Sequence, residues 1–140
     1  MTEEKADIGP ATTRWVIDLD WLAANKRSFS ILIRDCLCPS CSREFGAAGD
    51  KTSPDVLIAA VQKCCSGVPD FISKKTPVAE AVFRILLRNG NQPLTLAELG
   101  RRLSESRGGD PYRSTPELLY RIMKNDRFYG LQELADDIPR

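Results

Sequence analysis

Five cysteines and no histidine constrain this chain more than any other feature of its 140 residues. The cysteine number is odd, and the charged start of the chain, from Met1 to Asp7, has no apolar segment typical of an export signal. A disulfide framework is therefore disfavoured. We expect a cytoplasmic protein in which the cysteines hold a metal.

The segment Cys38-Pro39-Ser40-Cys41 has the spacing of a zinc knuckle. Two thiolates in such a turn can converge on one metal while backbone amides donate to their sulfurs. Structural zinc takes four ligands in a tetrahedron, and without histidine all four should be thiolates. Cys64 and Cys65 are the distant pair, so the sequence predicts a structural Zn²⁺ ion held by Cys38, Cys41, Cys64 and Cys65.

The adjacent cysteines Cys64 and Cys65 leave the set of metal ligands open. Two neighbouring cysteines bind one metal only if the helix that carries them loosens at its end, which Ser66-Gly67 permits. Cys36 can replace either Cys64 or Cys65 as a ligand. Alternatively, Cys64 and Cys65 are ordinary core residues, as free cysteines often are. A thioredoxin-like redox motif is disfavoured, because the strand and helix that should surround it are missing.

The first half of the chain is predicted to be a polar flexible tail (residues 1–13) followed by a helical, cysteine-containing zinc-binding unit (14–73). Apolar residues at intervals of three and four predict a helix from Trp21 to Leu37, interrupted near Ser28 and Ser30. A second helix begins at Ser53-Pro54-Asp55, and residues 45–52 are expected to be a loop. A unit this small needs an additional cross-link to be stable, and a bound zinc ion can supply it.

The second half is predicted to be a winged-helix unit (74–132) followed by a tail (133–140). Thr76-Pro77 and Thr115-Pro116 have the form of helix starts. Thr95 and Glu98 have the spacing of a capping box. The end of the unit, from Phe128 to Leu131, is rich in residues that favour strands. We therefore expect a mainly α-helical protein with a short β wing.

Four stretches of this half carry a resemblance to a known family: residues 81–86, 92–99, 115–119 and 125–131. The segment from Val78 to Leu131 resembles the HARE-HTH group of winged helix-turn-helix domains, which includes the N-terminal domain of the bacterial RNA polymerase delta subunit. It departs from that group in an insertion at residues 107–112 and in a very short final strand. The resemblance implies a winged helix and an association with transcription and DNA binding.

Charge distribution is consistent with that implication. Between Lys74 and Leu131 there are eleven Lys and Arg residues and six Asp and Glu residues, although the whole chain has a net charge of only +1. In a DNA-binding winged helix the third helix enters the major groove. We predict nucleic-acid contacts from the outward face of this helix and the residue just before it: Arg113, Tyr120, Arg121 and Lys124. The carboxylate of Glu117 on the same face would repel the phosphates.

The function predicted from these features is that of a zinc-containing winged-helix binding protein associated with nucleic acid or transcription. The alternative is a non-catalytic adaptor that binds another protein and keeps the zinc as a structural ion. The chain has no histidine base and no Walker phosphate loop, so we expect no catalytic residues, no enzyme activity and no small-molecule substrate. No apolar run approaches the roughly 20 residues of a membrane span.

Overall fold

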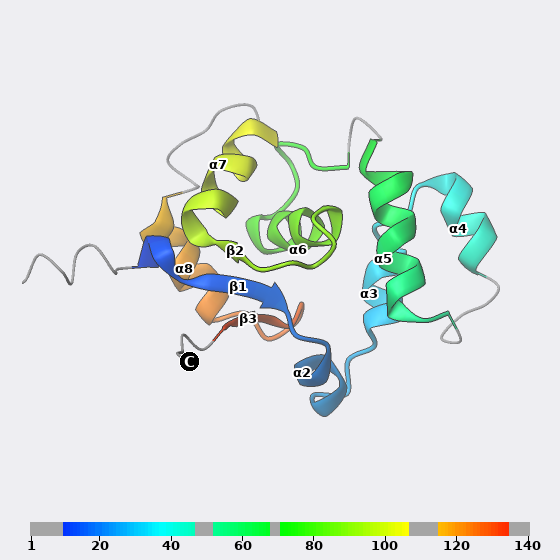
Figure 1. Cartoon of the computed structure of the whole chain (residues 1–140), viewed down its shortest axis with the longest axis horizontal. Helices are drawn as coiled ribbons and strands as arrows, with labels where there is room; N and C mark the ends of the chain where they lie inside the picture. The colour runs from blue at the N-terminus through cyan, green and yellow to red at the C-terminus, as the bar shows by residue number, and fades with distance from the viewer. Residues whose placement is uncertain (1–9, 47–51, 68–70, 107–114, 135–140) are drawn as a thin grey trace, which may run out of the picture.

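The computed structural model describes residues 10–46, 52–67, 71–106 and 115–134, which form a mainly helical protein with one small antiparallel sheet (Figure 1). The described elements, in chain order, are η1 (Pro10–Thr12), β1 (Arg14–Ile17), α2 (Leu19–Ala24), α3 (Phe29–Arg34), α4 (Pro39–Gly46), α5 (Pro54–Lys63), η3 (Cys65–Gly67), α6 (Val78–Arg88), β2 (Leu94–Thr95), α7 (Leu96–Ser106), α8 (Pro116–Lys124) and β3 (Leu131–Glu133). The expected mainly α class with a short β element is confirmed.

The sheet joins the two halves of the chain. Its strand order is β2-β1-β3, and β1 pairs antiparallel with both neighbours, Trp15 lying opposite Leu94 and Val16 opposite Gln132. The sheet therefore crosses the predicted boundary at residue 74. The predicted tail is also shorter than residues 1–13, because η1 contacts α7 and α8, and β3 continues to Glu133.

Most predicted helix starts are present, because they depend on local hydrogen bonds. N-cap side chains accept a backbone N–H at the starts of α2, α3, α5 and α8: Asp18, Ser28, Ser53 and Thr115. The Ser28 cap interrupts the long helix predicted from Trp21, as expected. Thr95 and Glu98 form the capping box, the Glu98 carboxylate accepting the Thr95 N–H at 2.9 Å. Thr76 does not cap α6; its hydroxyl oxygen accepts the Ser73 N–H instead.

Helix α4 was not predicted. The sequence indicates a turn at Cys38 to Cys41 and a loop at residues 45–52, whereas Pro39–Gly46 is helical. Pro39 occupies the first position of the helix, where its missing N–H costs nothing. The Cys38 carbonyl accepts the Ser42 N–H at 2.8 Å, which closes the first turn of this helix.

One hydrophobic core runs through the molecule. At its centre the ring of Phe83 on α6 lies 6.3 Å from that of Phe29 on α3 and 5.1 Å from that of Tyr129, just before β3. Trp15 on β1 packs edge to face on Tyr120 of α8, with ring centroids 6.0 Å apart. These ring contacts join residues of both predicted halves within one hydrophobic core.

The loop before β3 is held by a buried carboxylate and a glycine. Gly130 has φ +71°, and a Cβ there would lie 2.8 Å from Leu22 Cγ, so this position requires glycine. The close approach lets the Gly130 carbonyl accept the Asp18 N–H at 2.8 Å. Asp126, only 8% exposed, accepts the backbone N–H groups of Phe128, Tyr129 and Leu131 at 3.1 Å.

Replacing Asp126 should destabilise the protein, because Asp126→Ala leaves three backbone donors without their acceptor. We expect a loss of about 2–4 kcal/mol in the free energy of unfolding, measured by urea denaturation. Asp126→Asn keeps one acceptor oxygen and should lose roughly half as much. Equal losses for the two variants would show that these hydrogen bonds do not hold the loop.

Candidate functional site

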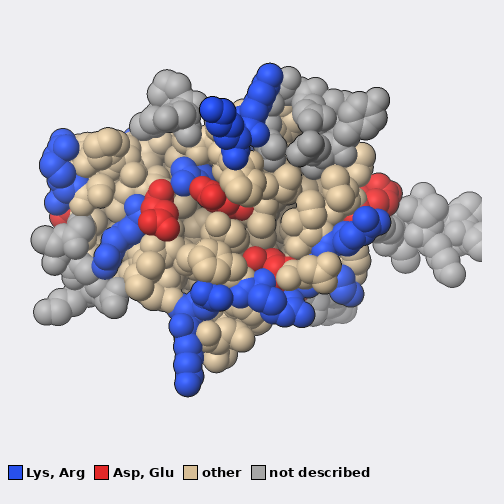
Figure 2. Space-filling view, turned by 180° about the vertical axis from the view of Figure 1, so that it is seen from behind, with Lys and Arg blue, Asp and Glu red and all other residues tan. Residues whose placement is uncertain are grey.

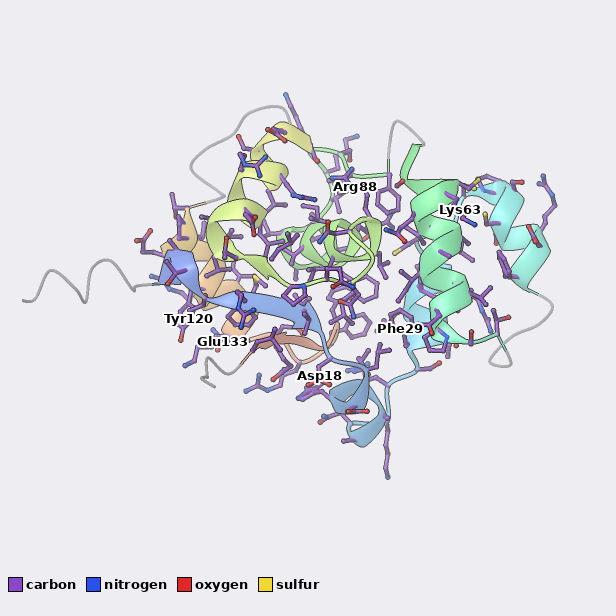
Figure 3. The ribbon with its side chains drawn as sticks, viewed as in Figure 1. Asp18, Phe29, Lys63, Arg88, Tyr120 and Glu133 are labelled. Carbon is purple, nitrogen blue, oxygen red and sulfur yellow. The ribbon has the colours of Figure 1, made fainter. Side chains whose placement is uncertain are left out.

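Three cysteine sulfurs meet where α4 and α5 approach each other. The Sγ atoms of Cys38, Cys41 and Cys64 all lie within 4.8 Å of one another, and those of Cys38 and Cys64 are 3.5 Å apart. Figure 3 shows sulfur atoms near the labelled Lys63, between the end of α5 and the start of α4. These three thiols can hold a metal ion.

Cys65 belongs to the same cluster. Its sulfur accepts the backbone N–H of Cys38 at 3.1 Å, and its pKa responds to the neighbouring thiols of Cys38 and Cys41. The chain reaches this arrangement because α5 ends at Lys63: Cys64 is the C-cap, and a single 3-10 turn begins at Cys65. The loosened helix end lets two adjacent cysteines face one cluster, as the sequence predicts. Three of the four predicted ligands, Cys38, Cys41 and Cys64, thus lie within 4.8 Å of one another, and Cys65 adjoins them through its contact with the Cys38 N–H.

The thiols of the cluster differ in acidity. The backbone N–H of Cys41 and the thiol of Cys64 donate to the sulfur of Cys38, and together they lower the Cys38 pKa to about 7. Burial raises the pKa of Cys41 and of Cys65. A divalent cation would reverse this effect, because a coordinating thiol loses its proton to the metal. One thiol of the cluster is thus ready to ionise at neutral pH, whereas the buried Cys41 and Cys65 need a cation to do so.

Cys36 stands apart from the cluster. It is buried, its thiol lies 3.8 Å from the Leu32 carbonyl oxygen as a weak donor, and burial raises its pKa to about 12. Neither Cys36 nor Cys65 is among the three thiols that lie within 4.8 Å of one another, but Cys65 contacts the Cys38 backbone, whereas the thiol of Cys36 faces the Leu32 carbonyl. This geometry favours Cys65 over Cys36 as the fourth ligand. Cys36 packs as a small core residue.

Arg84 on α6 fixes the segment that leads into the cluster. Its guanidinium donates to the carbonyl oxygen of Asp35 at 3.1 Å and to that of Phe71 at 3.0 Å, and it pairs with the Glu80 carboxylate at 2.8 Å. Asp35 is the C-cap of α3 and lies three residues before Cys38. Arg84 therefore connects the cysteine cluster to the helical core.

A second candidate site is a row of cations on the opposite part of the molecule. We define the basic edge as Lys26, Arg27, Arg121, Lys124 and Arg127, all exposed. Contacts connect them: the Arg27 guanidinium lies 4.4 Å from the ring of Phe128, and Arg127 donates to the Lys124 carbonyl oxygen. Figure 2 shows Lys and Arg side chains gathered along the lower edge of the molecule in that view.

Aromatic rings alternate with these cations. Lys124 Nζ lies 5.3 Å from the centre of the Tyr120 ring, and Phe128 is 43% exposed beneath Arg27. Glu117 on α8 is exposed and acidic, as anticipated. A surface of cations interleaved with aromatic rings can bind phosphates and stack on bases.

The structure places three of the four predicted nucleic-acid contacts on this surface. Arg121 and Lys124 are exposed on α8, and Tyr120 is half-buried between Trp15 and Lys124. Arg113 lies outside the described residues. Prediction from sequence missed Lys26 and Arg27, although the cap at Ser28 implies an exposed turn just before it.

Comparisons of this chain with protein families, with curated proteins and with solved structures find no match. The HARE-HTH resemblance therefore stays a prediction. Within the described ranges, no helix combines the length and the apolar character that a membrane crossing requires. What the protein does must be inferred from the cysteine cluster and the basic edge.

Proposed function

We propose that the protein is a zinc-containing winged-helix protein that binds nucleic acid through its basic edge. For the metal, the donor set carries the argument. Zn–S bonds of about 2.3 Å in a tetrahedron separate the sulfurs by about 3.8 Å. The observed 3.5 Å between Cys38 and Cys64, and the limit of 4.8 Å for all three clustered sulfurs, bracket that value.

Zinc is the ion that a soft, all-sulfur donor set favours. Cys65, whose sulfur accepts the Cys38 N–H, would complete the four ligands. The role proposed for the ion is structural, because four protein ligands leave no open position for a substrate. Bound zinc would fix the start of α4 to the end of α5.

The winged-helix proposal is supported by the order of elements α6-β2-α7-α8-β3. In that order α8 takes the place of the recognition helix and β3 that of a wing strand. The sheet differs from a wing made of a single hairpin, because its central strand β1 comes from residues 14–17. The N-terminal segment would thereby become part of the binding unit.

The observation that carries the nucleic-acid proposal is the basic edge with its aromatic rings. Five exposed cations follow one edge from the turn after α2 to the loop after α8, and two of them lie over the rings of Tyr120 and Phe128. Most affinity for nucleic acid comes from phosphate contacts of this kind, and it falls as salt concentration rises.

The double variant Arg121→Ala/Lys124→Ala should weaken binding to a labelled DNA duplex and to an RNA hairpin. Fluorescence anisotropy at several salt concentrations should give a shallower slope of log affinity against log salt, reduced by roughly one for each phosphate that the variant no longer neutralises. Thermal stability should stay within about 2 °C, because both side chains are exposed.

A matched control removes the same charge elsewhere. Arg43 on α4 and Lys75, which precedes α6, are exposed and do not belong to the basic edge, so Arg43→Ala/Lys75→Ala should keep the original salt slope. Failure of the unmodified protein to bind either probe in the micromolar range at about 50 mM salt would defeat the proposal.

A second function, that of a protein-binding adaptor, is favoured by a different surface. Ile31 and Val56 are 55% and 46% exposed, and a groove of about 500 Å³ runs between α4 and α5 beside Phe45 and Val56. Apolar side chains left on the surface in this way are typical of protein contacts. If nucleic acid does not bind, this groove becomes the leading candidate.

A further inference from the structure

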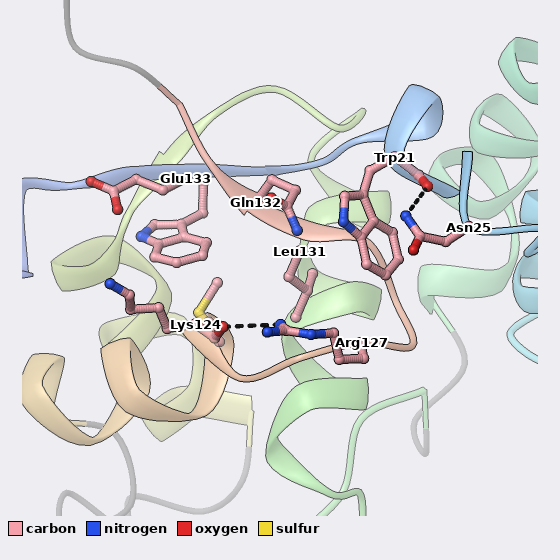
Figure 4. Close-up of a pocket in the computed structure, with 9 residues that line it drawn as sticks. Trp21, Asn25, Lys124, Arg127, Leu131, Gln132 and Glu133 are labelled. Atoms are coloured by element: carbon pink, nitrogen blue, oxygen red, sulfur yellow. Dashed lines mark hydrogen bonds between the residues drawn. The ribbon is translucent and has the colours of Figure 1, made fainter. Parts of the chain in front are cut away.

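Next to the basic edge lies a cavity of about 490 Å³, formed where α2, α8 and β3 meet (Figure 4). Its volume falls in the range of sites that hold small organic molecules, roughly 300–1,000 Å³. Segments far apart in the sequence build it: Trp21 and Asn25 come from α2 and the residue after it, and Gln132 comes from β3. The sequence offered no sign of this site.

The walls of the cavity combine two indole rings, those of Trp15 and Trp21, with several polar groups. The indole of Trp21 is half-buried and stands beside the Gln132 amide, above the guanidinium of Arg127 (Figure 4). Asn25 is held in place at the rim, because its amide donates to the Trp21 carbonyl oxygen at 2.8 Å. An aromatic plane beside amide donors and acceptors suits a flat heterocycle with polar edges.

Cations occupy the rim of the same cavity. Lys124 and Arg127 line it, and Arg127 is oriented by donating to the carbonyl oxygens of Lys124 and Asp126 at 3.3 and 3.0 Å. Both residues also belong to the basic edge. A strand whose phosphates follow that edge would therefore carry its bases past the mouth of the cavity.

We infer that this cavity receives an unpaired base of a single-stranded nucleic acid, which stacks on Trp21 while the neighbouring phosphates lie on Lys124 and Arg127. The inference rests on the proposed function and narrows it from nucleic acid in general to a strand with at least one unpaired nucleotide. Bases in a duplex are stacked on one another and do not offer a face to an indole. Glu133 is the acidic residue of the lining. Its carboxylate repels phosphate, so the cavity favours the base of a nucleotide over its phosphate.

The test compares a labelled strand of twelve thymidines with a duplex of mixed sequence and equal length, at about 50 mM salt. Trp21→Leu should weaken binding of the single strand at least about fivefold and change duplex binding less than about twofold. Trp21→Phe, which keeps an aromatic ring, should restore most of the affinity. The strand should also quench the tryptophan fluorescence of the unmodified protein, and Trp21→Phe should remove most of that quenching, because Trp21 is half-buried whereas Trp15, also in the lining, is only 2% exposed.

The outcomes separate the inference from the proposed function. If the unmodified protein binds neither the single strand nor the duplex, the base site fails, and the proposed function fails with it unless the RNA hairpin binds. If it binds the duplex but not the single strand, or if Trp21→Leu weakens the two equally, the base site is wrong and the basic edge stands. If Trp21→Leu does not fold, as circular dichroism would show, the quenching experiment decides: binding of the strand without quenching would overturn the inference.

Discussion

Removing the proposed zinc ion from the cysteine cluster should unfold the part of the chain that contains α4 and the end of α5. The cluster links these two helices, and structural zinc contributes about 10–16 kcal/mol of binding free energy in small zinc domains. Even a fraction of that value lost to a chelator should lower the melting temperature by more than about 10 °C. Thermal melts followed by circular dichroism, with and without EDTA, measure the change.

A matched pair of variants locates the effect. Cys41→Ser removes a clustered, buried thiol and should reproduce the instability of the chelated protein. Cys36→Ala removes a buried thiol that lies outside the cluster, so its melting temperature should still fall on addition of EDTA. A Cys41→Ser protein as stable as the unmodified one would contradict a structural role for the cluster.

Truncating Phe83 should destabilise the whole core. Its side chain is fully buried and its ring contacts those of Phe29 and Tyr129, one from each predicted half of the chain. Phe83→Ala should lower the free energy of unfolding by about 3–5 kcal/mol, measured by urea denaturation. The exposed Ile31 is the control: Ile31→Ala should change stability by less than about 1 kcal/mol.

The same experiment tests whether the halves form one body. Because Phe83 joins the two sides of the core, Phe83→Ala should shift a single cooperative transition to lower urea. Two separate transitions in the variant or in the unmodified protein would show instead that the predicted units unfold independently. That result would support a division of the chain into two units at residue 74.

Features fixed by local chemistry could be predicted from the sequence. The caps at Ser53 and Thr115 each need only a side-chain oxygen three residues before the donor. The cysteine cluster was also predictable, because knuckle spacing and the lack of histidine leave few other ligand sets. The loosening of the helix at Cys64 could be predicted too, because Ser66-Gly67 permits the helix to end there.

Features made by distant segments could not be predicted in the same way. The pairing of Trp15 with Leu94 and Glu133 depends on which strands meet after the helices pack, and no local pattern around β1 encodes it. The cavity beside Trp21 has the same origin, since α2 and β3 meet only in the folded chain. Thr76 failed as a cap because the Ser73 N–H competes for its hydroxyl.

Elemental analysis of the full chain, purified without chelator, tests the zinc centre most directly. We predict one zinc atom per chain in the unmodified protein and in Cys36→Ala, and far less than one in Cys41→Ser. A folded protein without zinc, or one whose thiols at Cys38 and Cys64 are joined in a disulfide, would contradict the account.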